Sequence, residues 1–307
     1  MKNKKVAIVG IGSGLGAADK RAQDGPYDII TKISKKYPKI PIFYKFYEDD
    51  YNHNHNVLDF TTVKWRKNDA LRAPFLLKRR EIISKILNEL YQTIYNLKKE
   101  GYFIIVLTGD HTYVLSIQAA LAAISSTDNT LLYIDAHMDA HTPRSSHSKN
   151  PHGMPNSTIL GYGGYKEWSS YMSSIKPHNF HLFGVRSFEP YEDKVLHKIG
   201  AGKNIHYMKD FFEVGSIEKH LMKAATESEK YSLSIDVDAF DPKYMPGTGY
   251  REPNGIHPRE ILHFLNFAGK DKKCELIEIT EYNPHKDTNK KTLQWIVRFI
   301  DEILDQD

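Results

Sequence analysis

The sequence has a single cysteine among its 307 residues, and this scarcity excludes a framework of intramolecular disulfides. That residue, Cys274, begins the apolar run "CELIEI", where we expect a small buried side chain and not a reactive thiolate. A protein without disulfides suits a reducing compartment, so we expect it to be cytoplasmic.

Long hydrophobic runs are also lacking. No stretch approaches the ~20 apolar residues that a membrane-spanning helix needs, so we expect no membrane partner. The opening "MKNKKVAIVGIGSG" has the lysines of a signal peptide, but its apolar part is short and interrupted by glycines. We interpret it as a first strand that enters a glycine-rich loop.

Neither sign of charge is in large excess. The 42 Lys and Arg residues against 38 Asp and Glu residues leave a net charge of +4, and the basic residues are scattered along the chain. Nucleic-acid-binding proteins concentrate basic residues, so we expect a small-molecule partner and no nucleic acid. Internal repeats and Pro/Ser-rich linkers are absent from the sequence, which predicts one domain over residues 1–307.

The sequence does contain short apolar runs that alternate with stretches of helical periodicity. The strand-like runs are 5–12, 40–48, 103–110, 130–137, 179–186, 231–240 and 274–284, and helical periodicity marks 76–101, 116–125 and 292–304. Several runs are almost continuous Val, Ile, Leu, Tyr and Phe, as in parallel strands that are buried on both faces. The alternation predicts an α/β fold whose ligands bind beyond the carboxyl ends of the strands.

Three polar segments between these elements need an interpretation. The pattern "GSGLGA" at 12–17 is similar to a dinucleotide-binding loop, but no helix opens on it before the break at Gly25-Pro26, so we favour a structural turn. His53 and His55 lie in "YNHNHNV", which we expect to be a solvated loop and not a metal site. The irregular stretch 141–165 is long enough to predict a functional loop.

Acidic residues and histidines cluster after three of the predicted strands. The clusters are Asp110-His111, then Asp135, His137 and Asp139, and finally Asp236 and Asp238 with Asp241 beyond. Residues two apart on an extended chain face the same way, so each cluster would point into one pocket. Carboxylates grouped at the ends of buried strands repel one another and lose hydration unless a cation lies between them. The clusters therefore predict a metal site.

The kinds of side chain indicate which metal and which chemistry. Carboxylates with a minority of imidazoles and no thiolate favour a hard or borderline ion such as Mn²⁺ over structural Zn²⁺. Four aspartates, Asp135, Asp139, Asp236 and Asp238, would balance two divalent ions. Two cations that share a water lower its pKa enough to give hydroxide at neutral pH, which predicts metal-assisted hydrolysis. Metallophosphoesterases use similar residues, but their D-x-H motif precedes the G-D motif, whereas here Gly109-Asp110 comes first.

Taken together, the motifs resemble those of the ureohydrolase family, which comprises arginase, agmatinase and formimidoylglutamase. The motifs are "GDHT", "DAHMD", "NPHGMP", "SIDVDAFDP", "PGTG" and "TEYNP". The resemblance implies a three-layer αβα sandwich with a mainly parallel sheet, an amidinohydrolase activity, two Mn²⁺ ions and a homo-oligomer of three or six chains.

The resemblance also implies roles for individual residues. One metal would take His111, Asp135, Asp139 and Asp236, and the other would take Asp135, His137, Asp236 and Asp238. The resemblance also makes Asp139 a catalytic residue. Glu281 would hold the guanidinium group, whose delocalised carbon is a poor electrophile and needs a strong nucleophile. His152 would give a proton to the leaving amine.

The substrate implied is L-arginine, which would be cleaved to L-ornithine and urea, because Ser148 and Asn150 match the arginase loop that meets the amino acid carboxylate. Agmatine or another guanidino or formimidoyl compound is the alternative. Four differences from arginases keep it open: His141 replaces an Asn, Glu189 replaces an Asp, Thr108 replaces a Gly, and "TGYREP" with Tyr250 and Arg251 replaces Thr-Gly-Thr-Pro. We expect His141 and Glu189 to contact substrate, and Arg251 to be placed for a second carboxylate. A catalytically silent protein is disfavoured because all six ligand positions are filled.

Overall fold

The computed structural model describes residues 4–47, 72–125, 127–214 and 217–305. His53 and His55, with the loop predicted around them, lie outside the described residues. Among the described residues, no helix has the length and apolar character needed to cross a membrane.

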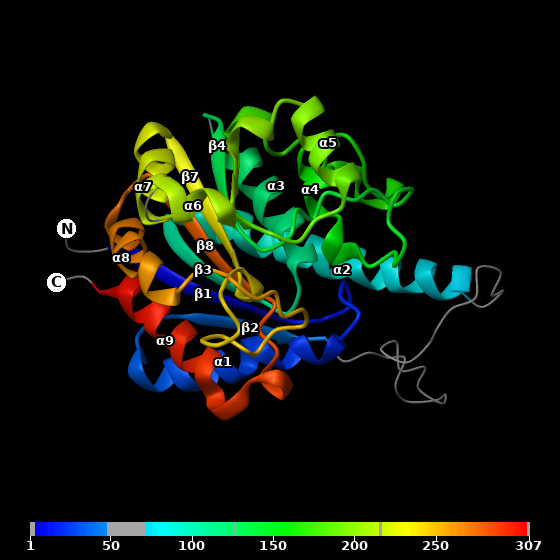
Figure 1. The fold of residues 1–307 in the computed structure, drawn as a ribbon. Helices are drawn as coiled ribbons and strands as arrows, with labels where there is room; N and C mark the ends of the chain where they lie inside the picture. The colour runs from blue at the N-terminus through cyan, green and yellow to red at the C-terminus, as the bar shows by residue number, and fades with distance from the viewer. Residues whose placement is uncertain (1–3, 48–71, 126, 215–216, 306–307) are drawn as a thin grey trace.

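A single eight-stranded sheet, with all strand pairs parallel, forms the middle of the molecule (Figure 1). Its strands are β1 (Lys5–Gly12), β2 (Ile42–Phe46), β3 (Tyr102–Thr108), β4 (Asn129–Ile134), β5 (Phe180–Val185), β6 (Ile205–Tyr207), β7 (Lys230–Asp236) and β8 (Cys274–Thr280), in the order β2-β1-β3-β8-β7-β4-β5-β6. The seven predicted strands are confirmed. The three-residue β6 was not predicted because "IHY" is too short to show a pattern.

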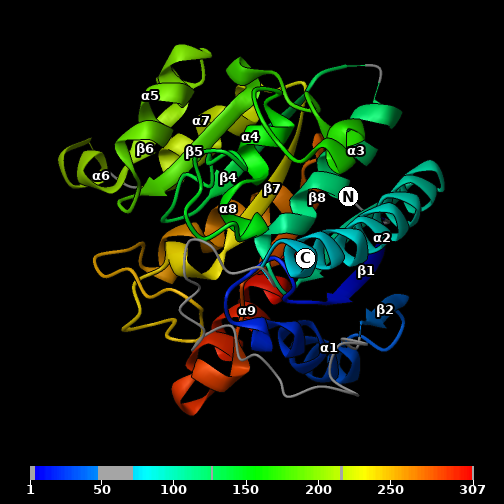
Figure 2. The same ribbon diagram turned by 90° about the vertical axis from the view of Figure 1, so that its right-hand side faces the viewer.

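Helices cover both faces of the sheet and make three layers (Figures 1 and 2). One face packs against α2 (Arg72–Lys99), α3 (Val114–Ile124), α4 (Pro155–Ile159) and α5 (Pro190–Lys198), and the other against α1 (Gly25–Lys36), α6 (Met208–Val214), α7 (Ile217–Glu227), α8 (Leu262–Lys270) and α9 (Lys291–Leu304). The strand side chains alternate between two apolar cores: Val9 and Val106 join the first, and Ile8 and Ile105 join the second. The predicted αβα sandwich is therefore confirmed.

The glycine-rich loop after β1 is a structural turn, as predicted. A 3-10 turn, Lys20–Asp24, follows the loop, and the α-helix α1 begins only at Gly25, with Pro26 in its first turn. The N–H of Gly16 donates to Asp110 Oδ2 at 2.8 Å, and a Cβ atom on Gly16 would collide with the side chains of Asp110 and Thr112. Glycine is needed here because the loop lies against the segment that carries His111.

Two further predictions concern local structure. Cys274 is buried, and burial raises the pKa of its thiol to about 12, so it is the inert side chain that the sequence suggested. The stretch 141–165 is irregular for most of its length, but it contains the short helix α4. Pro155 lies in the first turn of this helix, where the missing proline N–H has no partner to lose.

Candidate metal centre and substrate pocket

The clustered acids and histidines follow four strands that are neighbours in the sheet, β3, β8, β7 and β4. Because these strands are parallel, their carboxyl ends meet at one edge. His111 follows β3, the segment 135–139 follows β4, Asp236 ends β7 and Asp238 follows it, and Glu281 follows β8. Residues separated by up to 170 positions in the chain thus come together at this edge.

The prediction that the residues within each cluster lie on an extended chain was wrong for 135–139 and for 236–238. β4 ends at Ile134, and Asp139 has a φ of +47°. Asp236 is the last residue of β7, and Asp238 lies in the 3-10 turn Val237–Ala239 that follows. The backbone bends at these points, and backbone N–H groups hold the bent form: His137 N–H donates to Asp135 Oδ1 at 2.7 Å, and Asp238 N–H donates to Asp236 Oδ1 at 2.8 Å.

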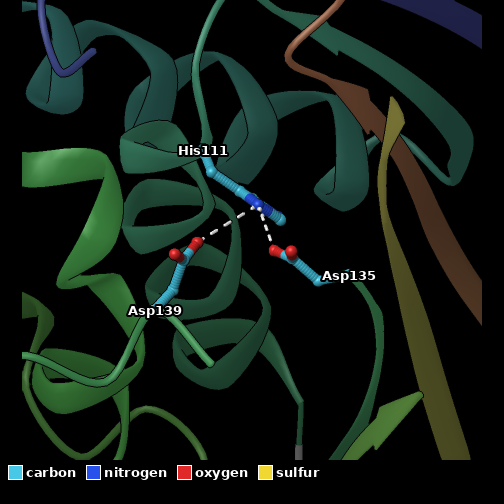
Figure 3. A group of neighbouring side chains, drawn as sticks. All are labelled: His111, Asp135 and Asp139. Atoms are coloured by element: carbon cyan, nitrogen blue, oxygen red, sulfur yellow. Dashed lines mark ion pairs between the residues drawn. The ribbon is translucent and has the colours of Figure 1, made fainter. Parts of the chain in front are cut away.

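The first group of ligand-type side chains surrounds Nδ1 of His111. This atom lies 3.1 Å from Asp135 Oδ2, 3.1 Å from Asp236 Oδ2 and 3.5 Å from Asp139 Oδ2. Figure 3 shows His111 pointing between the carboxylates of Asp135 and Asp139. His111, Asp135 and Asp139 lie close enough together to hold one metal ion.

The second group surrounds Nδ1 of His137. This atom lies 3.1 Å from Asp238 Oδ2 and 3.5 Å from Asp135 Oδ1. Asp135, His137 and Asp238 could hold a second ion. Asp135 belongs to both groups, with one oxygen directed to each, so the two groups form a single centre.

The electrostatics of this centre favour a bound cation. Burial and the adjacent charge of Asp135 raise the pKa of Asp139 well above its ordinary value. Burial, Asp238 and Asp135 raise the pKa of Asp236 in the same way. Asp135 Oδ2 is buried and accepts no hydrogen bond from the described residues. An unsatisfied buried carboxylate oxygen is costly unless a cation contacts it.

A chain of buried hydrogen bonds behind His111 favours a proton on Nε2 of its ring. Ser234 Oγ donates to Glu278 Oε2 at 2.7 Å, so this hydroxyl can accept from Nε2 of His111, which lies 2.7 Å away. Nε2 then carries the ring proton, and Nδ1 presents a lone pair to the carboxylates. The hydroxyl of Thr108 donates to Glu278 Oε1 at 2.9 Å. This contact gives a role to Thr108, one of the positions at which the sequence differs from arginases.

Tyr133 in β4 contacts two members of the first group. Its ring is stacked on His111, with 4.3 Å between centroids and 8° between planes. Its hydroxyl donates to Asp139 Oδ2 at 2.9 Å. Sequence reasoning missed Tyr133, Ser234 and Glu278; the available signal was the presence of polar groups inside otherwise apolar buried strands.

A pocket of about 340 Å³ opens above this centre. Among the predicted site residues it is lined by His137, Asp139, Asp236, Asp238, His152, Glu281, His141, Ser148 and Glu189. Glu281 Oε1 accepts the backbone N–H of His111 at 3.0 Å and lies 2.9 Å from Nδ1 of His152. Burial lowers the pKa of His152, but the carboxylates of Glu281, Asp139 and Asp110 together raise it above the ordinary value. Glu281 has a φ of +64°, and such strain is typical of functional positions.

The outer part of the pocket contains His141 between two glutamates. Its Nε2 lies 3.5 Å from Glu189 Oε1 and 3.6 Å from Glu192 Oε2, and its ring is parallel to Tyr191. Glu192 also accepts the N–H of Ala140 at 3.0 Å, which ties α5 to the loop that carries Asp135, His137 and Asp139. Glu192 was not predicted, because in the sequence it reads as an ordinary first-turn acid of a helix.

Several residues that the sequence analysis singled out do not line the pocket. Asn150 does not line the pocket; its Oδ1 accepts from Arg79 Nη1 at 3.1 Å, so the structure does not support the prediction that it faces substrate. Arg251 is also outside the pocket and donates to the carbonyls of Pro246 and Lys286, at 2.8 and 2.7 Å. Asp110 caps the turn at His111 by accepting Thr112 N–H at 3.0 Å, and Asp241 accepts the backbone N–H groups of Lys243 and Asn254, both at 2.9 Å.

Comparison with known proteins agrees with this arrangement. The sequence model of the arginase family matches residues 4–305. The arginase of Plasmodium berghei (strain Anka) is 28% identical over 317 residues, which cover 95% of this chain and 86% of the relative. The solved structure of arginase from Bacillus caldovelox has a TM-score of 0.80 at 24% identity and covers 99% of both chains. Formimidoylglutamase from Bacillus subtilis subsp. subtilis str. 168 has the same fold, with a TM-score of 0.70 at 18% identity and coverage of 99% of this chain and 87% of the other. The chain therefore belongs to the arginase family of ureohydrolases and is a hydrolytic enzyme of the amidinohydrolase type.

Proposed function

We propose that this enzyme hydrolyses L-arginine to L-ornithine and urea at a centre of two Mn²⁺ ions. The ligands would be His111, Asp135, Asp139 and Asp236 for one ion and Asp135, His137, Asp236 and Asp238 for the other. The observation that carries the proposal is the pair of His–Asp groups that share Asp135 at the base of a pocket whose wall contains Glu281.

The residues present fit such a centre. The donors are carboxylate oxygens and imidazole nitrogens, which suit Mn²⁺. The hydroxyl of Ser234 favours a ring proton on Nε2 of His111, which directs a lone pair of Nδ1 toward the oxygens of Asp135 and Asp236. A lone pair and carboxylate oxygens about 3 Å apart repel one another unless a cation lies between them.

Bound there, two divalent cations would supply a hydroxide at neutral pH, because they lower the pKa of a shared water. The side chains around them bind and orient the substrate. Glu281 provides a buried carboxylate for the guanidinium, and the N–H of His111 holds one of its oxygens in place. The cation on the substrate thereby compensates a carboxylate that is otherwise paired with His152.

His152 is the group best placed to move a proton in this pocket. Its Nδ1 lies 2.9 Å from Glu281, so a proton held at that atom is next to the guanidinium site. When the carbon–nitrogen bond of the tetrahedral adduct breaks, the leaving amine needs a proton within hydrogen-bond reach. We assign that donation to His152.

The outer pocket suits a cationic substrate, but it contains few groups that would bind a substrate carboxylate. Glu189 and Glu192 supply negative charge, and no Lys or Arg is found among the described lining residues. Of the two predicted partners for an amino acid carboxylate, Ser148 lines the pocket and Asn150 does not. This difference makes agmatine, which has no carboxylate, the second candidate. The naming of the matched relatives as arginases supports arginine as the first.

The test is to load the purified protein with Mn²⁺ and to measure urea and the amine product from arginine and from agmatine in parallel. We expect the larger kcat/KM for arginine, with ornithine as product. Asp236→Asn should abolish turnover, whereas the control Asp241→Asn, beyond the 3-10 turn that follows the same strand and outside the centre, should keep it. Urea release from neither substrate, or full activity in Asp236→Asn, would contradict the proposal.

We further infer a homo-oligomer of three or six chains in the cytoplasm, from the family resemblance alone. Light scattering of the purified protein tests the number of chains, and fractionation of the source cells tests the compartment.

A further inference from the structure

The loop 249–255, where this sequence differs from arginases, reaches from the rim of the pocket to the metal centre. Tyr250 lines the pocket and lies edge-on to His137, with 6.1 Å between ring centroids. Two residues further on, Glu252 Oε1 lies 3.5 Å from Nε2 of His137. Glu252 therefore faces Nε2 of His137, while the other ring nitrogen, Nδ1, faces the proposed metal position.

Arg186, which follows β5, holds this loop against the end of β7. Its Nη2 donates to the carbonyl of Asp238 at 2.7 Å and to the carbonyl of Glu252 at 2.8 Å. Its Nε donates to the carbonyl of Pro253 at 3.0 Å. A Cβ atom on Gly255 would lie 2.5 Å from Arg186 Nη2, so glycine at this position permits the contact. One guanidinium thus fixes the backbone of Glu252 relative to that of Asp238.

The two nitrogens of His137 face three carboxylates. Nδ1 lies 3.1 Å from Asp238 Oδ2 and 3.5 Å from Asp135 Oδ1, whereas Nε2 faces Glu252. A neutral imidazole has one N–H and one lone pair, and an ionised carboxylate can only accept. Both sides cannot be satisfied by one ring proton. If Glu252 takes the proton of Nε2, then Nδ1 and Asp238 can be joined only through a second proton or a metal ion.

We propose that Glu252 is a positioning residue that accepts the Nε2–H of His137 and so directs the Nδ1 lone pair to the second metal position. Such outer carboxylates fix the tautomer and orientation of metal-binding histidines. His111 has the Ser234 hydroxyl in the corresponding place, so the two histidines are held by acceptors of different charge. The inference rests on the metal centre of the proposed function but not on the identity of the guanidino compound.

The experiment compares Mn²⁺ binding by the wild-type protein and by Glu252→Ala and Glu252→Gln, with calorimetry on chelator-treated protein. We expect Glu252→Ala to weaken one of two binding steps by about 10–100-fold and to change the other by less than about threefold. Glu252→Gln keeps an acceptor oxygen and should recover most of that loss. The visible absorption of the Co²⁺-loaded protein should change in Glu252→Ala, because the ligand field at His137 changes.

Glu229→Gln is the matched control, since Glu229 is an exposed carboxylate that lines a different cavity. It should have wild-type affinity and a wild-type Co²⁺ spectrum. Wild-type binding and spectrum in Glu252→Ala would overturn the inference, and so would equal losses in Glu252→Ala and Glu252→Gln. If Glu252→Ala does not fold, Glu252→Gln and Glu252→Asp decide by the same measurements. A wild-type protein that binds two ions but hydrolyses no guanidino compound contradicts the proposed function alone, because the affinity readout does not depend on turnover.

Discussion

The hydroxyl of Tyr133 donates a 2.9 Å hydrogen bond to Asp139 Oδ2 while the ring of Tyr133 lies flat on His111. One fully buried side chain therefore contacts two proposed ligands of the same metal. Such support suits Asp139 because its backbone is in the left-handed region, which costs a non-glycine residue free energy that neighbouring contacts offset.

Tyr133→Phe should weaken metal binding at the position of His111 and Asp139. The change keeps the ring stacked on His111 and removes only the hydroxyl that orients the carboxylate. We expect about a tenfold loss of affinity for one Mn²⁺ ion, measured by calorimetry. Tyr231→Phe is the control, because it removes a tyrosine hydrogen bond to Asp271 that is remote from the centre. Equal affinities in the two variants would argue against an orienting role for Tyr133.

Ser234→Ala should lower both stability and metal affinity. It leaves Nε2 of His111 and an oxygen of Glu278 without their shared hydroxyl, and an unsatisfied buried polar group costs about 1–3 kcal/mol. Ser232→Ala removes a hydroxyl two residues earlier on β7 that binds Asn129 and Gln118. We expect urea denaturation to show a loss in both variants and Mn²⁺ titration to show a loss only in Ser234→Ala. A comparable loss of affinity in Ser232→Ala would make the effect a general one of strand β7.

Asp139→Asn should have effects of opposite sign with and without metal. In the chelated protein it removes an acid whose ionised form is disfavoured by burial and by Asp135, so the free energy of unfolding at neutral pH should rise. In excess Mn²⁺ the variant should be less stable than the wild type, because bound ions stabilise only the protein that binds them. Thermal melts in EDTA and in Mn²⁺ measure both effects. A destabilised variant in EDTA would show that the acids do not repel one another in the folded state.

Acid should destabilise the protein through two histidines, His181 in β5 and His206 in β6. Burial lowers the pKa of His181 and of His206 to about 4 in the folded protein, from an ordinary 6.5. The unfolded chain then binds more protons between pH 4 and 6.5, so this contribution to stability is complete above pH 6.5 and is lost as the pH falls toward 4.

His206→Phe should make that loss less steep. The ring already lies parallel to Phe183, with 4.5 Å between centroids, so a phenyl ring suits the position. Urea unfolding of chelated protein at pH 7 and pH 4.5 gives the comparison, and His178→Gln, at an exposed position, should keep the wild-type pH dependence. If the wild type and His206→Phe lose stability equally, His206 is protonated in the folded protein.

The sequence by itself determined the alternation of strands and helices, and with it the αβα sandwich, because continuous apolar runs and helical periodicity are local patterns. It also determined which acids and histidines would gather, since clusters at the ends of parallel strands share one edge. Asp135, His137 and Asp139 are close in the chain, so their grouping needed no knowledge of distant segments.

Only the tertiary structure decided how these residues are held and what surrounds them. Tyr133, Ser234 and Glu278 are single polar side chains in apolar strands, and nothing in their own segments shows what they contact. Asn150 does not line the pocket, and its oxygen accepts from Arg79, which lies 71 residues earlier in the chain. Glu252 lies near His137 because Arg186 donates to a carbonyl of its loop. Every residue has a carbonyl, so the sequence does not show this contact. Contacts of this kind depend on the three-dimensional path of the backbone, and that path is set by the packing of the whole sheet and its helices.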